Sequence, residues 1–147
     1  MSYRTEQIRN VALAGHPGAG KTTMFEALLH AGGALQTAGT VERGSTVSDF
    51  DPMEKGRGHS IDSAIASTDH AGIHVNLIDT PGYPEFRGQA LSALSAVETA
   101  LIVVDADSGV AHGTRRLMQC AKQRGLCRVV VVNKIDHEGA DCAAVLA

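Results

Sequence analysis

Tryptophan is absent from this 147-residue chain, and aromatic residues make up only 3% of it. The core must therefore be built from aliphatic side chains, chiefly valine and alanine. Long apolar runs are also missing, since none approaches the roughly 20 residues of a membrane-spanning helix. The polar first ten residues do not have the pattern of a signal peptide. We therefore expect no contact with a membrane.

Excess charge of either sign is small, with a net charge of −3. Direct binding to DNA through a general basic field is therefore not expected. Cysteine is scarce, and its three positions, Cys120, Cys127 and Cys142, form no C-x-x-C pair. Such an odd set is typical of reduced thiols in a cytoplasmic protein. Hydrophobic residues at 44% and charged residues at 20% predict an ordinary folded domain.

The pattern of apolar residues predicts an α/β fold in three layers, with a mostly parallel sheet. Runs that are apolar on both faces are typical of parallel strands covered by helices. They occur at 11–15, 73–79, 100–106 and 128–134, with helix-like segments at 22–31, 86–98 and 111–124. Residues 60–69 alternate and precede a turn-like sequence, which predicts one antiparallel edge strand.

Two stretches lie outside this alternation. Residues 32–59 have no apolar period, and a loop of this length is usually functional or disordered. The last residues, "GADCAAVLA", have the composition of the first turns of a helix.

The stretch "AGHPGAGKTT" follows the first predicted strand and contains the pattern G-x-x-x-x-G-K-[ST]. Glycines let such a loop wrap so that its backbone N–H groups point at phosphate oxygens, and the following helix adds its positive end. Lysine then reaches the outer phosphates, and the hydroxyl can ligate Mg²⁺. The alternative is an ordinary glycine-rich turn. The predicted phosphate-binding residues are Gly15, His16, Pro17, Gly18, Ala19, Gly20, Lys21, Thr22 and Thr23, with Lys21 also assigned to catalysis.

The strand at 73–79 ends in "DTPGY". Asp79 stands where a carboxylate can hold Mg²⁺ through water, and Gly82 can offer a flexible N–H to a third phosphate. A simple turn between strand and helix is the alternative. Asp79, Thr80, Pro81, Gly82 and Tyr83 are assigned to this part of the site.

The strand at 128–134 ends in "NKID". A carboxylate at Asp136 can accept two hydrogen bonds from the edge of guanine, which adenine cannot match. Asn133 can brace the loop, and the stem of Lys134 can cover the base; Ile135 completes the segment. The alternative is a solvated strand end. Three such motifs at carboxyl ends of strands predict a GTP or GDP site with Mg²⁺.

Together, "GHPGAGKTT", "DTPGYPEF" and "NKIDHEGAD" resemble the translational GTPases, and most of all elongation factor G and elongation-factor-G-like proteins. The stretch "GTVERGSTVSDFDPMEKGRGHSI" is similar to their first switch region. Peptide chain release factor 3 shares related segments, and ribosomal-protection tetracycline-resistance proteins share the same plan. The resemblance implies a P-loop GTPase fold, hydrolysis of GTP and a ribosome-bound, translocation-type factor that is monomeric at full length.

The resemblance also implies switch regions at about 35–60 and 80–90, and Ser60 as a metal ligand beside Thr22 and Asp79. Relative to the family, Gly18 replaces an aspartate, Ser60 a threonine and Tyr83 the histidine that positions the attacking water. Some elongation-factor-G-like proteins also carry tyrosine there. A slow GTPase is therefore expected, and the alternative is a nucleotide-binding switch with negligible hydrolysis.

Residues 1–147 would form a GTP-binding domain without its last strand, last helices and guanine-contacting Ser-Ala loop. The strand at 128–134 would then be an uncovered edge, liable to pair with other chains.

Overall fold

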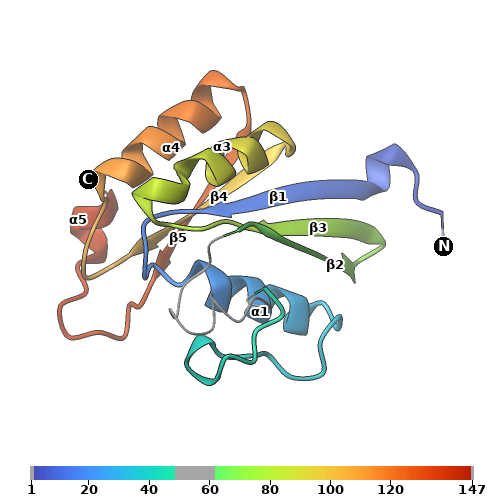
Figure 1. Ribbon diagram of the computed structural model, residues 1–147, viewed down its shortest axis with the longest axis horizontal. Helices are drawn as coiled ribbons and strands as arrows, with labels where there is room; N and C mark the ends of the chain where they lie inside the picture. Colours follow the sequence, from blue (N-terminus) through green and yellow to red (C-terminus); the bar gives the residue numbers. More distant parts are fainter. Residues whose placement is uncertain (1, 49–61, 147) are drawn as a thin grey trace.

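The computed structural model describes residues 2–48 and 62–146, and its centre is a five-stranded sheet (Figure 1). The order of the strands across this sheet is β2-β3-β1-β4-β5. Neighbouring strands run parallel except β2 and β3, which form an antiparallel hairpin. The predicted sheet with one antiparallel edge strand is confirmed. The strands are β1 (Ile8–Ala14), β2 (Ala64–His70), β3 (Ile73–Asp79), β4 (Thr99–Asp105) and β5 (Cys127–Asn133).

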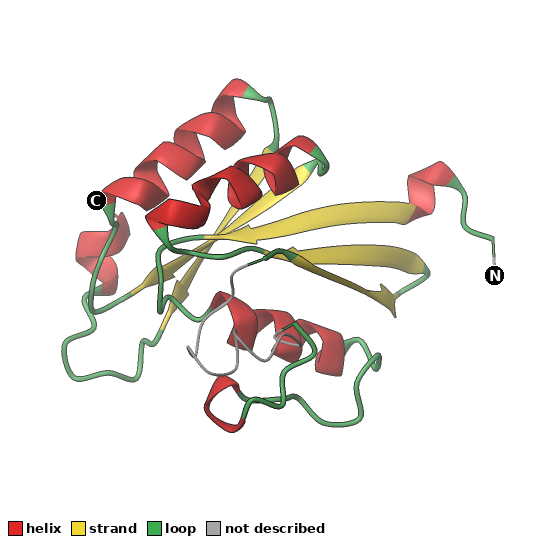
Figure 2. Ribbon diagram, in the orientation of Figure 1, coloured by secondary structure: helices red, strands yellow, loops and turns green. Residues whose placement is uncertain are grey.

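Helices cover both faces of the sheet, which gives the predicted three layers. Helices α3 and α4 lie together on one face, and α1 lies on the other (Figure 2). The helices are α1 (Lys21–Ala31), α3 (Arg87–Ser95), α4 (His112–Gln123) and α5 (Cys142–Leu146). Single 3₁₀ turns are formed by η1 (Thr5–Gln7), η2 (Val41–Arg43) and η3 (Pro84–Phe86).

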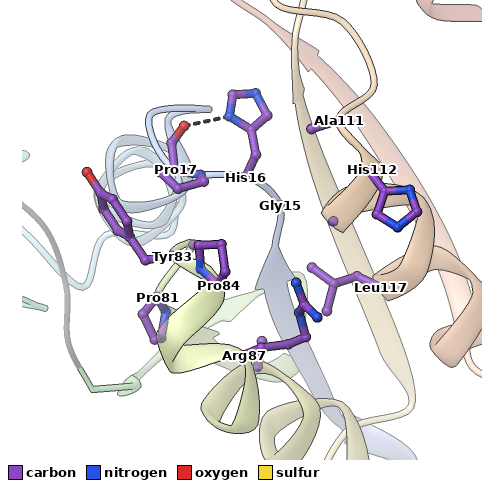
Figure 3. A pocket seen from close by; sticks show the side chains of 13 residues that line it. Gly15, His16, Pro17, Pro81, Tyr83, Pro84, Arg87, Ala111, His112 and Leu117 are labelled. Carbon is purple, nitrogen blue, oxygen red and sulfur yellow. Dashed lines mark hydrogen bonds between the residues drawn. The ribbon is translucent and has the colours of Figure 1, made fainter.

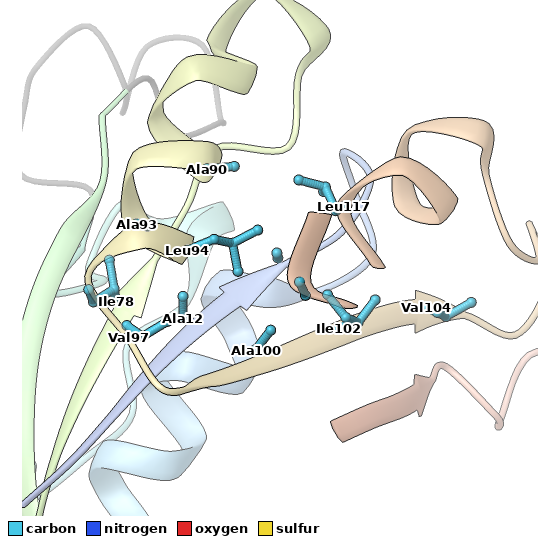
Figure 4. Close-up of a cluster of buried hydrophobic side chains, with 12 residues drawn as sticks. Ala12, Ile78, Ala90, Ala93, Leu94, Val97, Ala100, Ile102, Val104 and Leu117 are labelled. Carbon is cyan, nitrogen blue, oxygen red and sulfur yellow. The ribbon is translucent and has the colours of Figure 1, made fainter. Parts of the chain in front are cut away.

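The sheet divides the core into two halves. Strand β1 contributes to both, because successive side chains of a strand point to opposite faces. Ala12 and Ala14 belong to the cluster beneath α3 and α4 (Figure 4), whereas Leu13 packs with Phe25 and Leu29 of α1. Both halves are aliphatic or small except for Phe25. This composition agrees with the expectation of a core poor in aromatic residues.

The ends of the first strand and of helix α3 differ from the predicted boundaries. The first strand begins at Ile8, not residue 11, because Arg9 and Asn10 pair with β3 despite their polarity. It ends at Ala14, since Gly15 turns away at a φ of 155°. Helix α3 ends at Ser95, three residues earlier than predicted.

The long predicted loop is partly outside the described residues. Its described part, 32–48, contains η2, whereas 49–59 and the first two residues of the predicted hairpin strand are not described. The beginning of a helix near the last residues is confirmed as α5.

Three further observations concern the edge of the sheet, the helices and the cysteines. In the described sheet β5 is an edge strand, and Val129 and Val130 on it are 43% and 44% exposed. Among the described helices, none has the length and apolar character needed to cross a bilayer. All three cysteines are free thiols, as expected.

Candidate functional site

The loops that carry the three motifs gather at one edge of the sheet. Strands β1, β3, β4 and β5 are parallel, so their carboxyl ends share that edge (Figure 1). Ligands bind at this edge in open α/β sheets. The motif loops therefore lie where their chemistry can act on one ligand.

Gly20 joins the phosphate loop to α1 and is required by its geometry. It is the N-cap of α1 with a φ of 93°, a left-handed conformation that other residues adopt only at a cost. A Cβ here would lie 2.2 Å from Nδ2 of Asn133. That amide instead donates a hydrogen bond to the carbonyl oxygen of Ala19 at 2.9 Å. The third motif thus braces the first directly.

Lys21 begins α1 and is almost completely buried, at 7% exposure. Its Nζ donates to the carbonyl oxygen of His16 at 3.0 Å, which holds the ammonium inside the loop. A Cβ on Gly82 would lie 2.5 Å from this Nζ, so the second motif closes over the lysine. Burial lowers the pKa of Lys21, and the nearby Asp79 carboxylate opposes that shift. An anionic ligand would relieve the cost of this buried cation.

A hydrogen bond between the Thr22 and Asp79 side chains connects the first two motifs. The Thr22 hydroxyl donates to Asp79 Oδ2 at 2.6 Å, and Asp79 is 1% exposed. Next to it, the Thr80 hydroxyl donates to the Leu13 carbonyl oxygen at 2.6 Å and so fixes the end of β3 to β1. Hydroxyl and carboxylate oxygens are the ligands that Mg²⁺ prefers, so this pair fits the ion. Ser60, the other predicted ligand, lies outside the described residues.

Lys134 is held by a residue that the sequence did not indicate. Its backbone is left-handed, with a φ of 58°, and its Nζ lies 2.8 Å from Asp105 Oδ2 at the end of β4. The other oxygen of Asp105 accepts N–H bonds from Asp107 at 2.9 Å and Ser108 at 3.3 Å. The hydrogen bond from Lys134 is the main reason that the pKa of Asp105 falls to about 2. No local motif marks Asp105, because its partner is 29 residues away.

The remaining predicted residues are exposed or line a neighbouring cavity. Ile135 and Asp136 are exposed, with side chains accessible to a ligand, and Thr23 faces solvent on α1. Tyr83 is 38% exposed at the rim of a cavity of about 310 Å³ between the phosphate loop and α4 (Figure 3). His16, Pro17 and Gly82 also line this cavity.

A mostly parallel sheet with a glycine loop wrapped around a buried lysine, next to a threonine–aspartate pair, defines the class of P-loop GTPase folds. The match to a family model then gives the family. Residues 6–147 match the elongation factor Tu GTP binding domain, so the chain belongs to that family.

Similar proteins include translation factors. The chain is 46% identical over 134 residues to an elongation factor G-like protein of Mycobacterium tuberculosis, covering 91% of this chain and 19% of that protein. It is 40% identical over 137 residues to peptide chain release factor 3 of Lactococcus lactis, covering 90% and 26%.

Among solved structures, a protein from Thermus thermophilus superposes with a TM-score of 0.89. Its sequence identity to this chain is 44%, and the match covers 95% of this chain and 21% of that one. The chain therefore spans only about a fifth to a quarter of the proteins it resembles.

Proposed function

We propose that residues 1–147 belong to the GTP-binding and GTP-hydrolysing domain of a ribosome-associated translation factor resembling elongation factor G. One observation carries this proposal: the Asn133 amide bonds to the phosphate loop at Ala19, so the segment that ends in Asp136 is fixed beside the phosphate-binding residues. This contact supports a role for the nearby Asp136 carboxylate in reading guanine. The names of the similar proteins support the same function.

In this proposal the phosphates lie in the loop formed by residues 15–20. Backbone N–H groups and the start of α1 bind their oxygens, and Lys21 contacts the outer ones. Thr22 and Asp79, with Ser60, hold Mg²⁺, which supplies charge neutralisation on the phosphates when bound. Asp136 accepts hydrogen bonds from the guanine edge. The stem of Lys134, whose ammonium forms a salt bridge with Asp105, covers the base.

Hydrolysis is assigned to in-line attack by water on the third phosphate. The buried Lys21 ammonium and the loop N–H groups stabilise the charge that develops there. Tyr83, which lines the cavity beside Gly82, is assigned to orienting the water. The partners in this proposal are a guanine nucleotide and, through a longer protein, the ribosome in the cytoplasm.

A second candidate function is a nucleotide-binding switch with negligible hydrolysis. Tyr83 favours it, because an ordinary phenol, with a pKa of about 10, is a poor proton acceptor at neutral pH. Release factor 3 and tetracycline-resistance proteins remain alternatives for the step of translation that is served. This chain covers only about a fifth to a quarter of those proteins. The step of translation therefore depends on the parts of such proteins that this chain does not cover.

Binding and hydrolysis can be tested separately. In a competition titration against fluorescent GDP, unlabelled GDP and GTP should displace the probe, whereas ATP at a hundredfold excess should not. Displacement by ATP would refute guanine specificity. Single-turnover release of phosphate from GTP, with and without ribosomes, then separates the enzyme from the switch. Release that never exceeds the rate without protein would favour the switch.

A further inference from the structure

The exposed side of α4 is basic, although the whole chain has a net charge of −3. Leu117 and Ala121 pack into the core on one side of this helix, and its other side is turned to solvent (Figure 2). Exposed basic side chains occur on that side and in the chain just after it. We call them the basic face: Arg115, Arg116, Lys122, Arg124 and Arg128.

The geometry of α4 and β5 places these side chains on one surface. Arg115 and Lys122 are seven residues apart, so they lie on the same side of the helix about two turns from each other. Arg124 directly follows the last residue of α4. Arg128 pairs in register with Ala100, which belongs to the cluster beneath α3 and α4. Arg128 therefore points to the side of the sheet that α4 covers.

No acidic residue close in the sequence neutralises the basic face. The chain contains no aspartate or glutamate between Asp107 and Asp136. An ion pair within α4 would need an acidic residue three or four positions from a basic one, and the helix has none. The salt bridges found within residues 2–48 and 62–146 do not involve the basic face. Its charge is therefore open to an anionic partner.

Arg115 and Arg116 are not explained by the stability of α4. They are the fourth and fifth residues of a helix that begins at His112. The positive end of the helix dipole opposes a cation near this end, whereas Lys122 near the other end is favoured. Two adjacent arginines near the start of α4 therefore indicate a contact with a partner.

The side chains of the basic face favour phosphate over protein. Four of the five are arginines, whose planar guanidinium binds phosphate through two parallel hydrogen bonds. Centres of protein interfaces are enriched in aromatic side chains, but the large exposed apolar residues of the described chain all lie outside α4. Proteins bind single strands by stacking bases on aromatic rings, and α4 contains no aromatic residue other than a histidine. A duplex, which presents its phosphates outward, fits the face best.

We propose that the basic face binds the phosphate backbone of double-helical RNA, independently of base sequence. At 12 residues, α4 is about 18 Å long, so its arginines and Lys122 can contact several phosphates. A local face of this kind does not require a basic net charge. The choice of RNA over DNA rests on the proposed function in translation, whereas the phosphate contact rests on the charges of the face.

Binding is measured by the fluorescence anisotropy of a labelled RNA duplex of about 20 base pairs, with the nucleotide-free chain at about 50 mM salt. Arg115→Gln combined with Arg116→Gln should weaken binding about tenfold or more. The slope of log affinity against log salt concentration should become shallower by roughly two, because two phosphate contacts are lost. No measurable binding by the parent chain would overturn the proposal.

Arg4→Gln combined with Arg43→Gln is the matched control, because it removes the same charge from exposed positions outside the face. It should weaken binding less than about twofold. Equal losses in the two double variants would mean that binding depends on net charge alone, and would overturn the proposal.

The melting temperature separates a lost contact from a folding defect. Because Arg115 and Arg116 oppose the helix dipole, their double variant should melt no lower than the parent chain. If it melts lower, Arg124→Gln combined with Arg128→Gln tests the same face at its other end. Unchanged affinity for the RNA duplex in that second variant would overturn the proposal.

Competitors identify the class of partner. Polyglutamate at the same concentration of charge should displace the labelled RNA at least about tenfold less well than unlabelled RNA duplex. Equal displacement would assign the face to acidic proteins, and tighter binding of a DNA duplex of the same sequence would overturn the assignment to RNA. A chain that binds RNA but no guanine nucleotide would refute the proposed function and uphold the basic face. A chain that binds guanine nucleotides but no RNA duplex would overturn this inference alone.

Discussion

Asp136 is exposed near the start of the loop after β5, where its carboxylate is accessible to a base. Asp136→Asn would place an amide donor against a guanine donor. We expect GTP and GDP to bind more weakly by roughly 2–4 kcal/mol, or about 30- to 1000-fold, with preference moving to xanthine nucleotides. Titration calorimetry with GDP and xanthosine diphosphate measures both effects. Unchanged GTP affinity would show that Asp136 does not read the base.

Tyr83 offers a test of hydrolysis that leaves binding intact. An imidazole can act in either protonation state near neutral pH, so Tyr83→His should raise the rate in a longer protein on ribosomes. Positioning groups of this kind contribute about 10²–10⁴-fold, so partial recovery is measurable by single-turnover phosphate release. GTP affinity should barely change. If Tyr83→Phe were far slower than the parent and Tyr83→His gave no gain, the phenol hydroxyl itself would be the competent group.

Lys21 makes nucleotide binding dependent on pH. Burial lowers its pKa below the usual 10.5, and bound phosphates favour the charged form, so the pKa rises on binding. Binding at a pH between the lowered pKa of the free chain and the higher pKa of the bound chain should therefore take up protons, and affinity should fall as pH rises through the lowered pKa. Calorimetry in two buffers of different ionisation enthalpy measures the uptake. Lys21→Ala is the control, and an undiminished uptake in it would assign the effect to another group.

At the scale of elements, the joint between the phosphate loop and α1 is the most constrained point of the site. Gly20→Ala puts a Cβ on a left-handed residue and against the Asn133 amide. We expect a loss of about 1–3 kcal/mol in unfolding free energy together with weaker binding of GDP.

Gly88→Ala in α3 is the matched control, because in the described structure its Cβ would meet nothing within 4 Å. It should be neutral or stabilise by up to about 1 kcal/mol. Thermal melting of both variants measures the difference. Equal melting temperatures would contradict the role of the Gly20 conformation.

Elements were predictable from the sequence where the pattern is local. The continuous apolar runs located β3 to the residue, and the glycine loop located the start of α1 within one residue. Glu26 and Asp105 could not be found in this way. Asp105 pairs with Lys134, 29 residues away, and Glu26 accepts N–H bonds from Gly39 and Val47, 13 and 21 residues away; neither acidic residue lies in a motif. Polar contacts across a fold leave no periodic signal, because only the folded chain brings the partners together.

For the whole molecule, the exposed edge at β5 predicts self-association of the 147-residue chain. An uncovered strand presents unpaired N–H and C=O groups, and Val129 and Val130 add apolar surface. Val129→Lys should reduce association, because a charge at an edge opposes pairing. Sedimentation velocity over a range of concentrations measures it.

Ile65→Lys, on the opposite edge strand β2, is the control and should leave association unchanged. A parent chain that stays monomeric at every concentration would contradict the prediction. Association abolished by Ile65→Lys alone would assign the contact to β2 instead.

The bond between Asn133 and Ala19 also bears on how the protein is made. It joins residues 114 positions apart, so a nascent chain cannot complete it when the phosphate loop leaves the exit tunnel. At about 5–20 residues per second, synthesis of the intervening length takes roughly 6 to 23 seconds. During that interval the emerging polypeptide has its glycine loop without the brace that shapes it. The nucleotide would therefore be acquired late in synthesis, after β5 has emerged and docked against β4.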